Sequence, residues 1–144
     1  MKHFIKPDLF TTIVSIVCIV GIVFLIMTIE PALLSYAIIL FIIFVTAYFV
    51  IKMPIYSYVD KDKIIIKQLV GGKTFNRDSI YTQKISYKDL KGTIRLFGSG
   101  GFCGYIGWFS NSTLGKFYMI ASNKKDLLLI TTVSGKKYVI NCPL

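Results

Sequence analysis

The chain has 144 residues and a formal net charge of +10, from 17 Lys and Arg against seven Asp and Glu. All basic residues except Lys2 and Lys6 lie from Lys52 onward, so segment 52–144 accounts for the entire net charge, and its size suits one small domain. The only histidine is His3, and the three cysteines show no CxxC spacing. This excludes a zinc site of ordinary type, and no bound metal is expected.

Two apolar runs, residues 11–29 and 32–51, contain no charged side chain and are separated only by Glu30-Pro31. Crossing roughly 30 Å of hydrocarbon takes about 20 helical residues, so each run is long enough to span a bilayer. We therefore predict a transmembrane helical hairpin over residues 11–51, after a short basic head at 1–10. The alternative is a buried helical hairpin in a soluble protein.

The lysines beside the two runs predict the orientation of the hairpin. Lys2 and Lys6 precede the first run and Lys52 follows the second, whereas the connection carries only Glu30. Positive residues favour the cytoplasmic side, so both termini are expected there. A signal peptide is disfavoured because a second apolar run follows the first at once.

After Met53-Pro54 the hydrophobic pattern changes to a period of two, which is typical of strands. The expected strands include residues 56–59, 63–67, 81–86, 93–97 and 127–133, with turn signals between them. About seven strands are expected in this part of the chain. Their spacing predicts a mainly-β domain at 52–144, an antiparallel sandwich or a small barrel.

The most unusual stretch is 98–109, where five glycines alternate with aromatic residues. No helical pattern follows it and no G-K-S or G-K-T closes it, so it predicts no dinucleotide or nucleotide cofactor. Three interpretations remain open: a bulged hairpin or tight crossover with core-filling aromatics, a hydrophobic loop that contacts the membrane surface or a partner, and an anion nest of backbone N–H groups. As a candidate interaction loop it comprises Gly98, Gly100, Gly101, Phe102, Gly104, Tyr105, Gly107 and Trp108.

Four segments in order along the chain resemble the bacterial pleckstrin-homology-like (PH-like) membrane proteins, which have two spans followed by one PH-like domain. They are T-I-R-L-F-G-S-G-G-F-C-G-Y-I-G-W-F at 93–109, L-G-K-F at 114–117, A-S-N-K-K-D at 121–126 and G-K-K-Y-V-I at 135–140. The resemblance implies a bacterial cytoplasmic (inner) membrane protein. It also implies a strongly bent antiparallel sheet of seven strands, a partly open barrel closed at one end by a C-terminal helix.

That capping helix is expected to be missing here, because only Cys142-Pro143-Leu144 follow the last strand. Either the sequence is truncated, or the helical hairpin, a partner or a second copy covers the opening. An uncovered opening would expose core residues at about 25 cal/mol per Å².

The residue types needed for catalysis are sparse in segment 52–144. It has no histidine and no paired-carboxylate spacing, and Cys103 is the only candidate nucleophile, with no base identifiable nearby. We therefore expect no catalytic residues and a protein that is not an enzyme. Nucleic acid is disfavoured as a partner because the lysines are dispersed over turns.

Two hypotheses of binding function remain. In the first, the domain binds a protein partner, or a second copy of itself, at the cytoplasmic membrane face. In the second, it engages anionic lipid through the glycine-rich loop and through basic residues on one membrane-facing side: Lys52, Lys61, Lys63, Lys88 and Lys91. Because two helices already anchor the domain, lipid binding is not needed for recruitment, which favours a protein partner.

Overall fold

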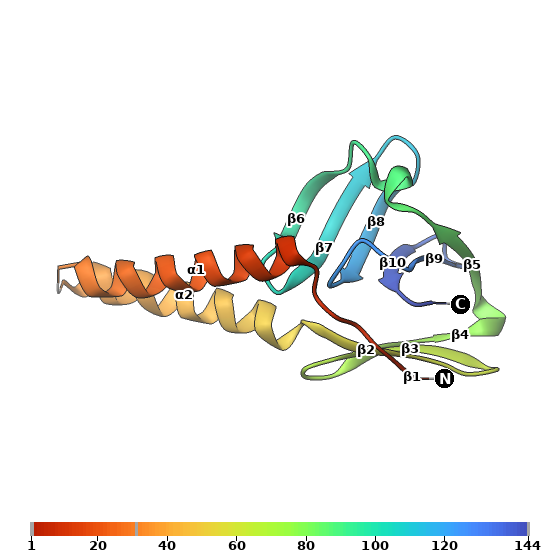
Figure 1. Ribbon diagram of the computed structural model, residues 1–144, viewed down its shortest axis with the longest axis horizontal. Coiled ribbons are helices and arrows are strands. Elements are labelled where there is room, and N and C mark those ends of the chain that lie inside the picture. Colours follow the sequence, from red (N-terminus) through yellow and green to blue (C-terminus); the bar gives the residue numbers. More distant parts are fainter. Residues whose placement is uncertain (1, 31, 144) are drawn as a thin grey trace.

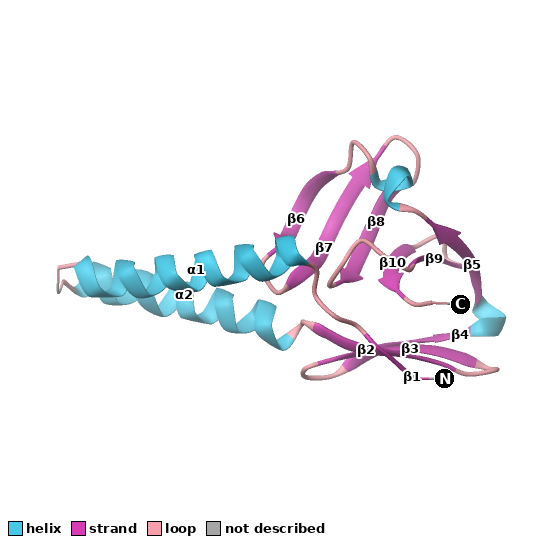
Figure 2. Cartoon of the chain, viewed as in Figure 1, coloured by secondary structure: helices cyan, strands magenta, loops and turns pink. Residues whose placement is uncertain are grey.

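The computed structural model describes residues 2–30 and 32–143; Met1, Leu144 and the Pro31 of the predicted connection lie outside the described residues. A long helical hairpin projects from a β-domain (Figures 1 and 2). The helices and strands are β1 (Lys2–Phe4), α1 (Leu9–Thr28), α2 (Leu33–Ile51), β2 (Pro54–Val59), β3 (Lys63–Gln68), β4 (Gly72–Asn76), β5 (Ile80–Ile85), β6 (Ile94–Gly101), β7 (Gly104–Asn111), β8 (Gly115–Ala121), β9 (Leu127–Thr132) and β10 (Lys137–Asn141). Two short 3₁₀ helices, η1 (Arg77–Ser79) and η2 (Tyr87–Leu90), flank β5.

The two helices agree closely with the predicted spans. Asp8 caps α1 by accepting a hydrogen bond from the Thr11 backbone N–H at 2.8 Å. Each helix is long and apolar enough to cross a membrane, yet 6% or less of its most apolar stretch is buried within the structure. A core helix of a soluble protein would be mostly buried, so the packing does not support the soluble alternative.

The strands form two sheets, with orders β1-β2-β3-β4 and β5-β9-β10-β8-β7-β6. The two sheets do not close, so a closed barrel is not seen, and the mainly-β, PH-like class is confirmed. The described chain has nine strands after α2 rather than about seven. The sheet is also not purely antiparallel: the β9–β10 hairpin places β10 beside β8, and these two strands run parallel.

The six-stranded sheet is buried on both faces. One face packs against the four-stranded sheet, with Ile64, Ile66 and Phe75 meeting Leu128 and Ile130. The other face forms a second core cluster under η2 and the β6–β7 hairpin, which includes Leu127, Leu129, Phe109 and Phe117. Burial on both faces explains why 127–130 is a continuous apolar run rather than an alternating one. Beyond β10, the described residues Cys142 and Pro143 form no helix.

The helical hairpin is fixed to the β-domain at both of its ends. At the start of α1, the Asp8 backbone N–H and the Thr11 hydroxyl both donate to the Ser122 carbonyl, at 3.2 Å each. At the end of α2, the Gln68 side chain donates to the Lys52 carbonyl at 2.8 Å. The position of the domain relative to the helices is therefore set by direct hydrogen bonds rather than by a flexible linker.

Candidate functional site

The glycine-rich stretch forms a β-hairpin. Strands β6 and β7 pair from Ile94↔Ser110 to Gly101↔Gly104 and turn at Phe102-Cys103. Gly98 and Gly107 face each other across the pair with φ of +120° and +138°, and a Cβ on either would collide with the backbone of the other strand. Only glycine fits this approach, and it allows the two strands to bend sharply together. The backbone thus follows the hairpin interpretation.

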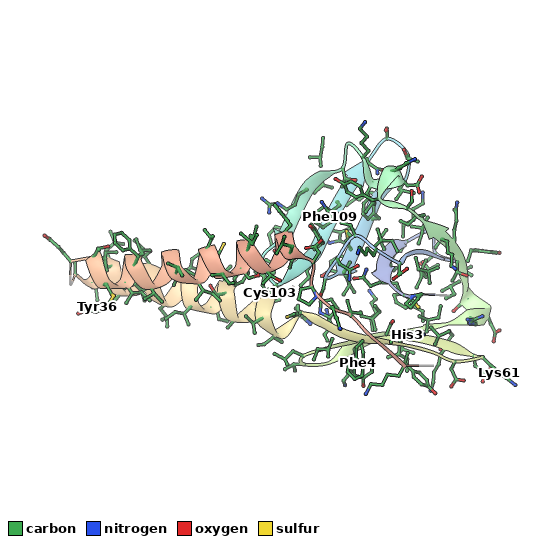
Figure 3. The ribbon with its side chains drawn as sticks, in the orientation of Figure 1. His3, Phe4, Tyr36, Lys61, Cys103 and Phe109 are labelled. Carbon is green, nitrogen blue, oxygen red and sulfur yellow. The ribbon has the colours of Figure 1, made fainter. Side chains whose placement is uncertain are left out.

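The tip of the hairpin lies against the two helices. The Cys103 backbone N–H donates to the Ser15 hydroxyl of α1 at 2.9 Å, and Figure 3 shows Cys103 where the turn meets the helices. Gly101 lies against Phe10 and Val14, and an added Cβ would come within 3.0 Å of the Phe10 ring. Phe102 lines a cleft of about 260 Å³ whose other walls include residues of both helices. The tip therefore lies beside α1 rather than free in solvent.

Strand β6 forms one edge of the six-stranded sheet and presents an exposed apolar surface. Ile94, Leu96 and Phe97 are 69%, 53% and 72% exposed. A bulge between Arg95 and Phe97 interrupts the pairing with β7. In Figure 1, β6 is the strand of this sheet that lies on the helix side of the domain. We call Ile94, Leu96 and Phe97 the β6 edge patch.

Aromatic residues gather where β6 and β7 approach the end of α2. Phe97, Trp108 and Tyr118 line a small cleft with Tyr48 and Phe49. The rings of Trp108 and Tyr118 meet edge to face with their centroids 5.2 Å apart. Tyrosine and tryptophan are enriched at membrane–water interfaces, where one end of the ring is apolar and the other wet. Tyr48, in the last turn of α2, belongs to this cluster.

The basic residues expected to share one face are divided among separate places. Lys52 follows the last turn of α2. Lys61 lies at the end of the domain away from the helices (Figure 3), and Lys63 begins β3 just after it. Lys88 lies in η2 and Lys91 directly follows it. The structure brings together Lys88 and Lys91 but neither with Lys61.

Cys103 is partly exposed but lacks the lowered pKa of an activated nucleophile. Burial raises the pKa of its thiol above the ordinary value, and the nearby Ser15 hydroxyl lowers it only in part. A raised pKa leaves less thiolate at neutral pH, and the thiolate is the reactive form. Within residues 2–30 and 32–143, no group of three His, Cys, Asp or Glu side chains could hold a metal ion.

We expect Cys103 in the full-length protein to react with iodoacetamide more slowly than a free cysteine in a peptide at pH 7 to 8. Because its pKa is raised, the rate should go on rising at pH values where the peptide rate has levelled off. Peptide mass mapping after quenching measures this, with Cys142, which is buried, as an unreactive internal control. A profile that levels off at a lower pH than the peptide would instead indicate an activated thiol.

The β6 edge patch was not identified from the sequence. Residues 93–97 were expected to form a strand, but no local pattern shows that this strand lies at a sheet edge. Strand β6 lies at the edge because all the other strands of this sheet lie on one side of it, in the order β5, β9, β10, β8 and β7. The sequence does contain a signal for the bulge in this strand. Leu96 and Phe97, directly before the glycines, are two adjacent apolar residues, and they break the period-two pattern where the bulge lies.

Residues 56–142 match the family model described as a bacterial PH domain. This confirms the resemblance predicted from the sequence. No curated protein and no solved structure matches the chain.

Proposed function

The chain belongs to the bacterial PH domain family, and from that premise we propose that it is a membrane-anchored, non-enzymatic module that engages anionic lipid at the cytoplasmic membrane surface. The two apolar helices form the anchor, with both termini in the cytoplasm of a bacterial cell. The β6–β7 hairpin and the β6 edge patch lie in the headgroup layer. The region after α2 carries the entire +10 charge, but its predicted membrane-facing lysines are divided among separate places, so the proposal rests on the hairpin and not on one basic face.

The hydrogen bonds at the hairpin tip carry this proposal. Ser15 lies six residues beyond Leu9, about 9 Å along α1, so the turn bound to it reaches well past the start of the helix. Backbone groups at such a depth need partners inside the protein, because water is scarce there. The Cys103 N–H has the Ser15 hydroxyl, and the Phe102 carbonyl accepts from the Ser99 hydroxyl at 2.6 Å. These two backbone groups of the turn thus have partners within the protein, as an apolar surrounding requires.

The β6 edge patch limits how deep the sheet can lie. An edge strand has unpaired backbone N–H and C=O groups on its outer side, and these are costly in hydrocarbon. Ile94, Leu96 and Phe97 therefore favour the headgroup layer, where apolar side chains reach the acyl boundary and the backbone stays hydrated. Only the tip of the hairpin goes deeper.

Photo-crosslinking in native membranes tests this arrangement. A photoreactive amino acid in place of Phe97 should give lipid adducts, and the same group in place of Tyr81 should not. Tyr81 is a matched control because it is also exposed, 74%, but lies on β5, the opposite edge of the same sheet. Equal lipid labelling at both positions, or none at Phe97, would contradict the proposal.

A protein partner is the second candidate, and the free edge of β5 favours it. Among the strands that the structure describes, only β9 pairs with β5, so the outer backbone groups of β5 are open to an added strand. Tyr81 and Val133 add exposed apolar side chains beside this edge, and Val133 bonds to the Ser79 carbonyl. A discrete protein adduct at the Tyr81 position, or a crosslinked dimer of this chain, would support binding there.

A further inference from the structure

A cavity of about 500 Å³ lies between η2, the following loop and the β6–β7 hairpin, and its volume is within the usual range for small-ligand sites. We call it the β6–η2 pocket. It is lined by Tyr87, Leu90, Lys91, Gly92, Thr93, Arg95, Gly100, Tyr105, Phe109, Met119 and Lys124. None of the proposals above uses this cavity.

The lining is cationic. Lys91, Arg95 and Lys124 come from three separate segments, and no Asp or Glu lies among the lining residues. Arg95 lies across the inner side of the hairpin, since a Cβ added at Gly100 would come within 3.3 Å of its guanidinium. Three positive charges around one cavity attract an anion, and the arginine fork adds geometric preference for phosphate or carboxylate.

Aromatic rings hold Lys124 in place without neutralising it. Its ammonium lies 4.7 Å from the ring centroid of Tyr87, 5.1 Å from that of Tyr105 and 5.6 Å from that of Phe10. Cation–π contacts of this kind orient a lysine while leaving its N–H donors and its charge available. Phe10 belongs to the first turn of α1, so this end of the pocket lies at the level where the helix begins.

Tyr105 contributes its ring, not its hydroxyl, to the wall of the pocket. Its side chain is only 6% exposed, and its hydroxyl has essentially no solvent-accessible surface. Burial raises the pKa of Tyr105, and hydrogen bonds with the Thr11 and Lys124 side chains lower it only in part. The three cations are therefore the groups that make the pocket suitable for an anion.

We infer that the β6–η2 pocket binds the phosphate group of an anionic lipid, an inference that rests on the membrane-surface function proposed above. The phosphate oxygens face Lys91, Arg95 and Lys124. The acyl chains pass beside Phe10 at the start of α1. A free phosphate compound has the same recognition chemistry, so the test separates the two sources.

Native mass spectrometry of the full-length protein in a mild detergent, titrated with dioleoyl phosphatidylglycerol, measures the site directly. We expect one retained lipid molecule, and dioleoyl phosphatidylcholine should be retained less. Lys124→Gln should weaken retention about tenfold, as expected for the loss of a charged hydrogen bond. Lys136→Gln removes the same charge from an exposed turn and should change nothing.

The remaining outcomes separate this inference from the function on which it rests. Equal losses for Lys124→Gln and Lys136→Gln, or no retained phosphatidylglycerol, overturn the pocket even if Phe97 crosslinks to lipid. Specific retention without lipid adducts at Phe97 supports the pocket and contradicts the β6 edge contact. If inorganic phosphate binds to the protein in phosphatidylcholine nanodiscs, and Lys124→Gln weakens this binding to the same extent, the lipid source is overturned. The pocket is then assigned to a free phosphate compound.

Discussion

Replacing Gly107 with alanine is expected to destabilise the full-length protein by about 3 kcal/mol or more, through loss of the β6–β7 hairpin. Two effects add. Gly107 has φ of +138°, a conformation that side chains disfavour, and its Cβ would meet the Phe97 carbonyl and the Gly98 Cα of the paired strand. Both obstacles are backbone atoms, so no side-chain rotation relieves the collision. Thermal unfolding in detergent, followed by the fluorescence of Trp108, measures the loss.

Gly135→Ala is the matched control. Gly135 also has positive φ, +77°, but nothing lies within 4 Å of its added Cβ. Gly135→Ala should therefore lower the stability only by the strain of alanine in the left-handed conformation, about 1–2 kcal/mol. A loss for Gly107→Ala no greater than for Gly135→Ala would mean that the strands separate easily and that their close approach is not required.

The same glycines explain which parts of the fold could be predicted. The helices were predictable because two long uncharged runs have few alternatives, and the family resemblance came from a block dense in glycine. Strand β7 was predicted only as one arm of the hairpin interpretation, because Gly104 and Gly107 hide the alternation that marks a strand. Yet this strand carries Tyr105 and Phe109 into the core. Glycines that allow close strand approach thus resemble a loop in sequence.

The β6–η2 pocket lay beyond prediction for a different reason. Lys91 and Arg95 are near in sequence, but Lys124 reaches the pocket from the loop between β8 and β9. In the sequence, no pattern in the neighbouring residues shows that Lys124 rather than Lys125 lines a pocket. The difference is made by tertiary contacts: the rings around Lys124, and the hydrogen bonds that shape its loop.

Those hydrogen bonds converge on Asn141, and Asn141→Ala is expected to cost about 3–4 kcal/mol. Asn141 is buried at the end of β10. Its side-chain nitrogen donates to the Lys125 carbonyl at 2.7 Å and to the backbone and side-chain oxygens of Asn123. Its side-chain oxygen accepts from the Ser122 backbone N–H at 2.8 Å. Truncation leaves buried backbone groups of this loop without partners, which costs more than the bonds themselves contribute.

The loss should extend beyond stability, because this loop joins the β-domain to α1. The Ser122 carbonyl receives the Asp8 N–H and the Thr11 hydroxyl, and Asn123 donates to the Lys6 carbonyl at 2.7 Å. A displaced loop would move Lys124 out of the β6–η2 pocket and loosen the start of α1. We therefore expect retention of phosphatidylglycerol to fall in native mass spectrometry at temperatures where the domain is still folded.

Asn76→Ala provides the comparison for Asn141→Ala. Asn76 is exposed, and its side chain does not cap the 3₁₀ helix that follows it, so its truncation should change the free energy of unfolding by no more than about 0.5 kcal/mol. Chemical denaturation of both variants in the same detergent gives the two values. If Asn141→Ala is as mild as Asn76→Ala, water replaces the amide without cost. The loop that carries Lys124 would then be held by its aromatic contacts alone.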